Sequence, residues 1–96
     1  MTYDFGAGPV PAHRHTNPDG TEGGWVADTA FVAKTAYVGT DACVYDNASV
    51  SGNAYVFSNA KVYGNAHISD TASVSGNACV FGNAQIFGNA CVYGNK

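Results

Sequence analysis

The sequence predicts an all-β protein whose short strands repeat every six residues. An aliphatic side chain returns at every sixth position from Val26 to Val92, and an alanine stands two residues before each one from Val32 onward. Between each aliphatic residue and the next alanine lie two residues of turn character, most often Gly-Asn. A helix cannot satisfy this pattern, because a six-residue period drifts around a helix of about 3.6 residues per turn and places glycine in its interior.

The repeating unit is therefore A-x-V-x-G-N, and each of its parts has an expected place. Side chains two residues apart lie on the same face of a strand, so the alanine and the aliphatic residue both point inward. Glycine and asparagine tolerate the positive φ of a tight corner, so the Gly-Asn pair makes the corner. Asparagines stacked in successive coils can add a ladder of side-chain hydrogen bonds.

With this unit over residues 26–95, the chain resembles the hexapeptide-repeat superfamily, whose fold is a left-handed parallel β-helix. The resemblance implies that three units make one coil of a triangular solenoid. The twelve aliphatic positions then give about four coils. We expect residues 26–96 to form this β-helix and residues 1–25 to form an irregular N-terminal cap segment.

The segment 1–25 lies outside the repeat and is rich in glycine and proline. We expect it to fold over the first coil, with Phe5, Val10 or Trp25 covering the apolar end of the interior, as solenoid caps do. The first corners, Asp28-Thr29, Lys34-Thr35 and Thr40-Asp41, depart from Gly-Asn, as terminal repeats usually do. The repeat runs on to Lys96, where we expect an open strand edge that favours association.

Outward aromatic side chains are expected to stack in columns along the coils. One column follows the inward valines of the first face and comprises Tyr45, Tyr63 and Phe81; a second group, on the third face, comprises Tyr37, Tyr55, Phe57 and Tyr93. Such ladders stabilise neighbouring coils, and aromatic residues are also enriched in interface cores, so both interpretations stay open. We expect both groups to form an interface in a homo-oligomer, a dimer or trimer, with end-on stacking as the other mode.

Composition and charge exclude several classes of partner. The net charge is −3 with only four basic residues, which form no basic patch, so we expect no nucleic acid. No apolar run is long enough for a membrane span and no signal peptide is evident, so we expect no membrane and synthesis in the cytosol. Cys43, Cys79 and Cys91 form no metal-type pair and are expected to be free thiols, with no cofactor bound.

Few residues carry catalytic or metal-binding chemistry. His67, the one histidine inside the repeat, points outward and is the weak candidate for a catalytic base, since many hexapeptide-repeat proteins are acyltransferases with a histidine at a subunit interface. His13 and His15 form an H-x-H pair that can bind zinc or nickel from an extended segment. No third ligand is obvious, so a pair of structural histidines is the preferred interpretation.

The segments Pro9–His15 and Gly23–Val26, followed by unbroken G-N-A-x-V repeats, resemble small hexapeptide-repeat proteins of bacteriophages and prophages. Our first hypothesis is a non-enzymatic structural or interaction module, phage-encoded and in that case virion-associated, that self-associates through an aromatic face or the open coil end. The second is an acyl-CoA-dependent acyltransferase-like trimer. The third is a phage inhibitor of a host protein, and the partner is then a host or phage protein.

Overall fold

The computed structural model describes residues 2–6 and 8–94, which form strands joined by tight turns and contain no helix. The strands are β1 (Thr2–Asp4), β2 (Pro9–Thr16), β3 (Glu22–Ala27), β4 (Phe31–Val32), β5 (Tyr37–Val38), β6 (Cys43–Val44), β7 (Ser49–Val50), β8 (Tyr55–Val56), β9 (Lys61–Val62), β10 (His67–Ile68), β11 (Ser73–Gly76), β12 (Cys79–Val80), β13 (Gln85–Ile86) and β14 (Cys91–Gly94). Most contain only two residues because a corner follows each inward aliphatic side chain.

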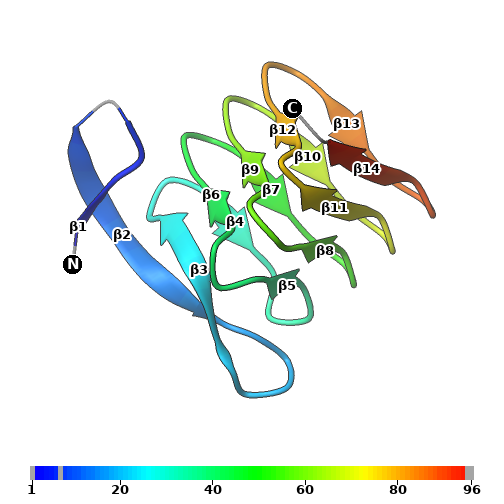
Figure 1. The fold of residues 1–96 in the computed structure, drawn as a ribbon, viewed down its shortest axis with the longest axis horizontal. Helices are drawn as coiled ribbons and strands as arrows, with labels where there is room; N and C mark the ends of the chain where they lie inside the picture. The colour runs from blue at the N-terminus through cyan, green and yellow to red at the C-terminus, as the bar shows by residue number, and fades with distance from the viewer. Residues whose placement is uncertain (1, 7, 95–96) are drawn as a thin grey trace.

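The strands form three sheets that run along the molecule, as Figure 1 shows. Sheet 1 has the order β1-β2-β3-β6-β9-β12, sheet 2 the order β4-β7-β10-β13, and sheet 3 the order β5-β8-β11-β14. From β3 onward every pairing is parallel and joins residues eighteen positions apart, such as Val26, Val44, Val62 and Val80. The predicted parallel β-solenoid of about four coils is therefore confirmed. Below, the first coil means β3–β5 and the upper coils mean β6–β14.

The interior is a narrow column of valine, isoleucine and alanine. Val38, Val44, Val50, Val56, Val62, Ile68 and Val74 are completely buried, as are the alanines two positions before six of them. This confirms the predicted inward positions. Burial of each such aliphatic side chain contributes about 1.5–3 kcal/mol to the free energy of unfolding. The repeat therefore supplies the hydrophobic core, which a conventional two-layer arrangement of this sequence would lack.

The corners of the upper coils have one residue in the left-handed region, and it is the first of the two corner residues. Glycine occupies it five times, at Gly52, Gly64, Gly76, Gly82 and Gly88, with φ between 63° and 71°. Asp46, Ser58 and Asp70 occupy it at φ of 58–60°. The carboxylates of Asp46 and Asp70 accept hydrogen bonds from the amides of Gly64 and Gly88 in the next coil. The second corner residue, an asparagine or Thr71, is not in this region, so only the first corner position has positive φ.

The first coil turns its corners differently. None of its corner residues has positive φ. In the upper coils the amide of the second corner residue bonds the coil above, as from Asn47 to the Gly64 carbonyl at 3.0 Å. In the first coil the hydroxyls of Thr29 and Thr35 make the corresponding contact, each donating to a carbonyl of the next coil at 2.5 Å. A side chain thus replaces the backbone donor at these two corners, which lack a residue of positive φ.

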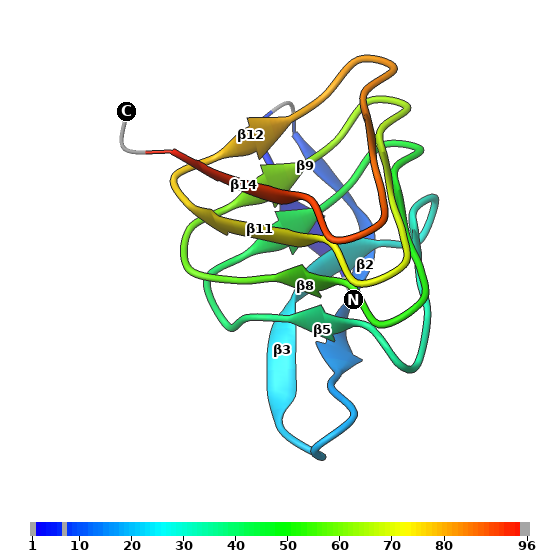
Figure 2. The same ribbon diagram turned by 90° about the vertical axis from the view of Figure 1, so that its right-hand side faces the viewer.

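The N-terminal segment, expected to be irregular, instead forms two antiparallel pairings. β1 pairs with β2, and β2 pairs with β3 beneath the first coil. The turn-forming residues lie between the strands, where Asn17 and Gly20 bond within the β2–β3 turn. Figure 2 shows this hairpin at the end of the stack that lies away from the last coil. The strands β1 and β2 therefore extend sheet 1, and the segment expected to wrap over the coil as a loop is part of this sheet.

Two polar side chains of this hairpin occupy the open edge of β5. The Asn17 side-chain oxygen accepts the Val38 amide at 2.8 Å, and His15 Nε2 lies 2.8 Å from the Ala36 carbonyl. Both side chains are buried, with 3% and 7% exposed. They give the first strand of sheet 3 the partners that a preceding coil would have supplied. Gly24 passes so close that a Cβ there would lie 1.9 Å from the Ala42 carbonyl oxygen.

Candidate functional site

The outer face of sheet 1 carries a continuous stack of aromatic rings, here called the aromatic column: Phe5, Tyr45, Tyr63 and Phe81. The successive ring centroids lie 4.6, 4.9 and 5.4 Å apart, with interplanar angles of 15°, 7° and 11°. The predicted stack of Tyr45, Tyr63 and Phe81 is confirmed. Its formation follows from the eighteen-residue register, which places these side chains above one another just after three inward valines.

Phe5 is the member of the column that the repeat does not encode. In the first coil the corresponding position is Ala27, which is too small to stack, and Phe5 places its ring against Tyr45 at this level. Gly6 and Gly8 donate their amides to the Asp4 carboxylate and adopt positive φ, which turns the chain beside this ring. Tyr3 extends the aromatic contacts from Phe5 to Trp25, at centroid distances of 4.8 and 4.9 Å.

Phe5, Val10 and Trp25, which were expected to cover the apolar end of the interior, lie elsewhere. Phe5 lies against Tyr45, and Trp25 points outward because the neighbouring Val26 points inward. Arg14 lies over the Trp25 ring at 5.4 Å and bonds the Gly23 carbonyl. Val10 is 39% exposed. The first-coil residues Ala30, Val32 and Ala33 remain only partly buried.

A groove of about 470 Å³ runs beside the aromatic column, between it and the start of β2. The rings of Phe5, Tyr45 and Tyr63 line it, together with Val10 and Pro11. Along the first corner of the coils it is lined by Asp28, Thr29 and Asp46. The groove is therefore mainly apolar and aromatic, with two carboxylates and no basic side chain among the described residues that line it.

Burial and acidic surroundings affect the tyrosine at the centre of this groove. Desolvation raises the pKa of Tyr45 to about 12, and the nearby Tyr63 and Asp46 act in the same direction. The phenol therefore stays protonated at neutral pH and remains a hydrogen-bond donor. Both faces of its ring are covered, by Phe5 on one side and by Tyr63 on the other.

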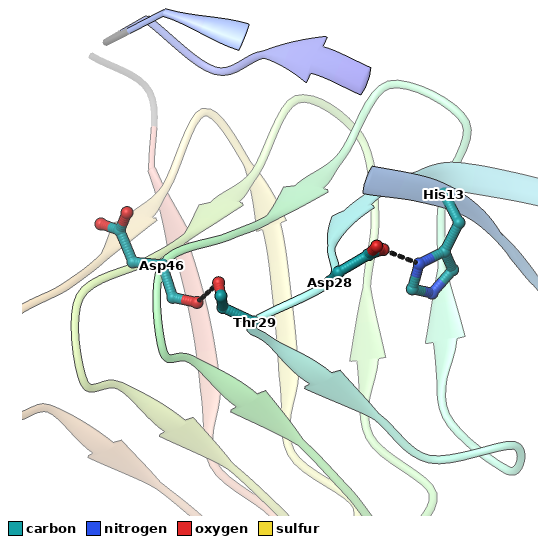
Figure 3. Close-up of polar contacts among 4 residues, drawn as sticks. All are labelled: His13, Asp28, Thr29 and Asp46. Atoms are coloured by element: carbon teal, nitrogen blue, oxygen red, sulfur yellow. Dashed lines mark hydrogen bonds and ion pairs between the residues drawn. The ribbon is translucent and has the colours of Figure 1, made fainter. Parts of the chain in front are cut away.

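His13 lies next to the groove and contacts one of its carboxylates, as Figure 3 shows. Its Nδ1 is 2.9 Å from Asp28 Oδ1, and both side chains are more than half exposed. A carboxylate that orients an imidazole in this way is one part of a general-base arrangement. The nearby Thr29 hydroxyl, however, donates to the Asp46 carbonyl and is not directed at the imidazole. The four residues thus form a hydrogen-bonded corner without an activated nucleophile.

The two histidines of the H-x-H pair do not share a ligand position. His13 is exposed and bonds Asp28, whereas His15 is buried against the Ala36 carbonyl. The register of β2 against β3 shifts between Arg14 and Thr16, where β3 carries one extra residue. Within residues 2–6 and 8–94, no three His, Cys, Asp or Glu side chains gather as a metal site would require.

His67 and the third face complete the predicted site residues. His67 is exposed on sheet 2, and its strand neighbours are Ser49 and Gln85, so no carboxylate stands beside it in the ladder. On sheet 3, Tyr37 and Tyr55 pack at 5.6 Å, and Phe57 lies above Gly39. The side chain of Tyr93 lies outside the described residues. These groups are therefore spread over different faces and do not converge.

The cysteines have the geometry expected of free thiols. Cys43 and Cys79 flank Lys61 in sheet 1, and Cys91 belongs to sheet 3. Partial burial raises the pKa of the Cys43 thiol, and the Lys61 charge opposes this rise. Cys43 is thus less reactive than an exposed thiol at neutral pH.

No family model, curated protein or solved structure matches this chain. In the part of the chain that the structure describes, no helix is long and apolar enough to cross a membrane. The candidate function therefore has to be argued from the aromatic column and the groove beside it.

Periodicity could not indicate three features of this region: the Phe5 ring, the groove, and the His15–Asn17 contacts with β5. All three depend on residues that lie before the repeat. A partial signal is present at Ala27, the one small residue in an otherwise aromatic outward column, which indicates that a ring from elsewhere is needed there.

Proposed function

We propose that this chain is a non-enzymatic structural and interaction module that self-associates through the outer face of sheet 1. The observation that supports the proposal is the aromatic column ending at Phe81, whose ring is 56% exposed. Lys61 is the one charged residue in β6, β9 and β12, the upper strands of this sheet. Interface cores are enriched in aromatic and depleted in charged residues, which is the composition found here.

Self-association would cover the exposed ring at the end of the column. The rigid stack of Tyr45, Tyr63 and Phe81 holds its rings in place before association, so little side-chain entropy is lost when a second copy packs against them. In this proposal a closed dimer or trimer forms through the column. The same proposal includes the left-handed coil of the hexapeptide-repeat superfamily and an origin in a phage or prophage, with synthesis in the cytosol.

The test is light scattering over a wide concentration range on the wild type and two matched variants. Phe81→Ser removes the exposed end of the column. Phe87→Ser, the control, removes a ring of similar exposure, 62%, from the second sheet of the same coil. We expect a discrete oligomer for the wild type and for Phe87→Ser, and a monomer for Phe81→Ser, with circular dichroism unchanged in all three.

Three results would contradict the proposal. A wild type that stays monomeric at all concentrations would direct the search to a foreign partner, as for a phage inhibitor of a host protein. Dissociation by Phe87→Ser alone would place the interface on sheet 2. Calorimetric binding of acetyl-CoA would favour the acyltransferase hypothesis, for which His67 is the candidate base.

A further inference from the structure

The three strands of the first coil differ at their lower edge, the edge that is turned away from the upper coils. The strand β3 pairs with β2 along this edge, and β5 receives the side chains of Asn17 and His15 there. The strand β4 is the last strand of sheet 2 and pairs only with β7, on its other side. Within residues 2–6 and 8–94, no strand and no side chain bonds the lower edge of β4.

The alternation of peptide groups along a strand identifies the open groups of β4. The amides of Phe31 and Ala33 donate to carbonyls of the coil above, at 2.9 and 2.8 Å. Successive amides of a strand point to opposite edges, so the Val32 amide points to the lower edge. The C=O and N–H of one trans peptide group also point in opposite directions, so the Ala30 carbonyl points the same way. The lower edge of β4 thus presents one donor and one acceptor.

Six residues later, β5 has the same pair of groups, and there the protein supplies their partners. The Val38 amide donates to the Asn17 side chain, and the Ala36 carbonyl is bonded by His15 Nε2, at 2.8 Å each. Val38 and Ala36 are completely buried, whereas the corresponding residues of β4 are only partly buried. The strand β4 therefore lacks three things that β5 has: an acceptor, a donor and a cover over its inward side chains.

We propose that the lower edge of β4 binds an extended segment of another protein, which adds to sheet 2 as a further parallel strand. All pairings within sheet 2 are parallel. An extended chain presents a carbonyl for the Val32 amide, an amide for the Ala30 carbonyl, and an inward side chain at the spacing of a β-strand. This side chain covers Val32 at the open end of the interior. It is a valine or isoleucine, since the inward aliphatic column of sheet 2 contains only these two residue types.

The charge beside β4 adds a requirement for the sequence of this segment. Lys34 lies two residues after Val32 and is exposed. It forms no ion pair in the described part of the chain, where His13 and Asp28 make such a contact at the other end of β4. In a parallel strand, an acidic residue two positions after the inward valine or isoleucine lies beside Lys34. The partner therefore carries an apolar residue followed, after one residue, by Asp or Glu.

The hairpin favours a single strand over a whole second copy as the occupant of this edge. The turn between β2 and β3 projects past the first coil, beyond β5, as Figure 2 shows. Two copies that met through their β4 edges would each bring this hairpin into the space between their first coils. A single extended segment requires only the width of one strand, about 4.8 Å, beside the hairpin.

The first measurement is amide hydrogen exchange by NMR in the full chain without a ligand. We expect the Val32 amide to exchange about a hundredfold or more faster than the Val38 amide, because Asn17 bonds the Val38 amide. The measurement is made in the wild type and in Phe81→Ser, whose substitution lies outside this site. Self-association through sheet 1 is thereby tested separately from the open edge of β4.

The second measurement titrates a synthetic peptide, acetyl-Gly-Asn-Ala-Ser-Val-Ser-Glu-amide, which carries one repeat unit and the acidic residue. We expect a saturable shift of the Val32 amide and none of the Val38 amide. In the parallel register the serine before the peptide's valine bonds the Ala30 carbonyl. Its N-methylation should weaken binding about fivefold or more. N-methylation of the valine, whose N–H points away from β4, is the matched control and should change affinity by less than about twofold.

A pair of lysine variants tests the charge requirement. Lys34→Ala should weaken binding of the peptide about two- to fivefold, with a smaller difference at high salt. Lys61→Ala, on the outer face of sheet 1, removes the same charge away from β4 and should leave the affinity unchanged. An equal loss in both variants would show that net charge alone attracts the peptide, which contradicts recognition by Lys34.

Four results would overturn the proposal. Slow exchange of the Val32 amide in the free chain would show that the edge is not open. A Val32 shift that grows with protein concentration in Phe81→Ser would identify a second copy as the occupant. Equal weakening by the two N-methylations would show that the peptide does not add as a strand. No saturable shift of the Val32 amide with the peptide would remove the site, and self-association through sheet 1 would be unaffected.

Discussion

The first coil with its hairpin and the upper coils satisfy their corner and strand-edge hydrogen bonds in different ways. Residues 1–42 carry seven of the eleven charged side chains, whereas residues 43–94 carry only Asp46, Lys61 and Asp70. The upper coils make their corners with a residue of positive φ, most often glycine, and with backbone hydrogen bonds. The first coil uses Thr29 and Thr35 at its corners and Asn17 and His15 along β5.

The difference shows what a neighbouring coil provides. An upper coil finds its donors and acceptors in an identical backbone one strand away, so its side chains need only be small inside and compatible with a corner outside. The first coil has no such neighbour below, and specific side chains take over that role. We therefore expect substitutions in the upper coils to act through packing, and those around the first coil to act through single hydrogen bonds.

The largest expected effect is that of a charge in the regular interior. Val62 is completely buried, and Val62→Asp would place a carboxylate there without a partner, at a cost of several kcal/mol, enough to unfold a domain of this size. Val32→Asp makes the same change in the first coil, where the side chain is only partly buried. We expect circular dichroism to show loss of β structure for Val62→Asp, and a folded protein with a lower Tm for Val32→Asp.

Ser69→Asp, on the outer side of sheet 2, is the matched control and should remain within about 1 kcal/mol of the wild type. Equal stability of Val62→Asp and Ser69→Asp would show that the inward assignment is wrong. If Val62→Asp and Val32→Asp unfolded the protein equally, the expected difference between the upper coils and the first coil would be wrong.

A smaller effect is expected from the side chains that bond the first coil. Asn17→Ala deprives the buried Val38 amide of its acceptor and should lower the free energy of unfolding by about 1–3 kcal/mol. Asn65→Ala removes only an exposed 3.4 Å contact with Asn83 in the upper coils, and we expect a loss below about 0.5 kcal/mol. Urea denaturation measures both, and a larger loss in Asn65→Ala would reverse the comparison.

The smallest effect concerns Tyr45, where the two regions meet. Because folding raises the pKa of Tyr45 from 10 to about 12, its contribution to stability is complete below pH 10 and is lost as the pH rises through about 12. Titration of tyrosinate absorbance should show one tyrosine ionising near pH 12. Phe5→Ala uncovers the ring and should lower this pKa. A pKa that stays near 12 in this variant would show that Phe5 contributes nothing to the desolvation.

The six-residue period was sufficient to predict the strands and the inward and outward positions from Val26 onward. The resemblance to the hexapeptide-repeat superfamily, with three units to a coil, implied the eighteen-residue register. It also predicted the stack of Tyr45, Tyr63 and Phe81, since these follow from the same register. The period could not predict the N-terminal hairpin, because residues 1–25 contain no repeat and their pairing with β3 is fixed by contacts formed only on folding.

Two particular residues show where local patterns fail. His13 and His15 have the spacing of neighbours on one side of a strand, but His13 binds Asp28 and His15 binds the Ala36 carbonyl of β5. Phe5 was expected at the end of the interior, yet the position left by Ala27 and the Tyr45 ring hold it on the outer face. In both cases tertiary contacts, which a short window of sequence does not contain, decide the outcome.

The constant spacing of eighteen residues between stacked partners also defines how a gene for this fold can change length. Slippage or unequal recombination between the repeated Gly-Asn-Ala codons that adds or removes eighteen codons yields a chain with one coil more or fewer, in which every column still matches. A change of six codons also preserves the interior, but it moves each later column to the next face and divides the aromatic rings between two sheets. Steps of six and of eighteen residues are thus equally compatible with the core, but only steps of eighteen residues keep each outward column on one sheet.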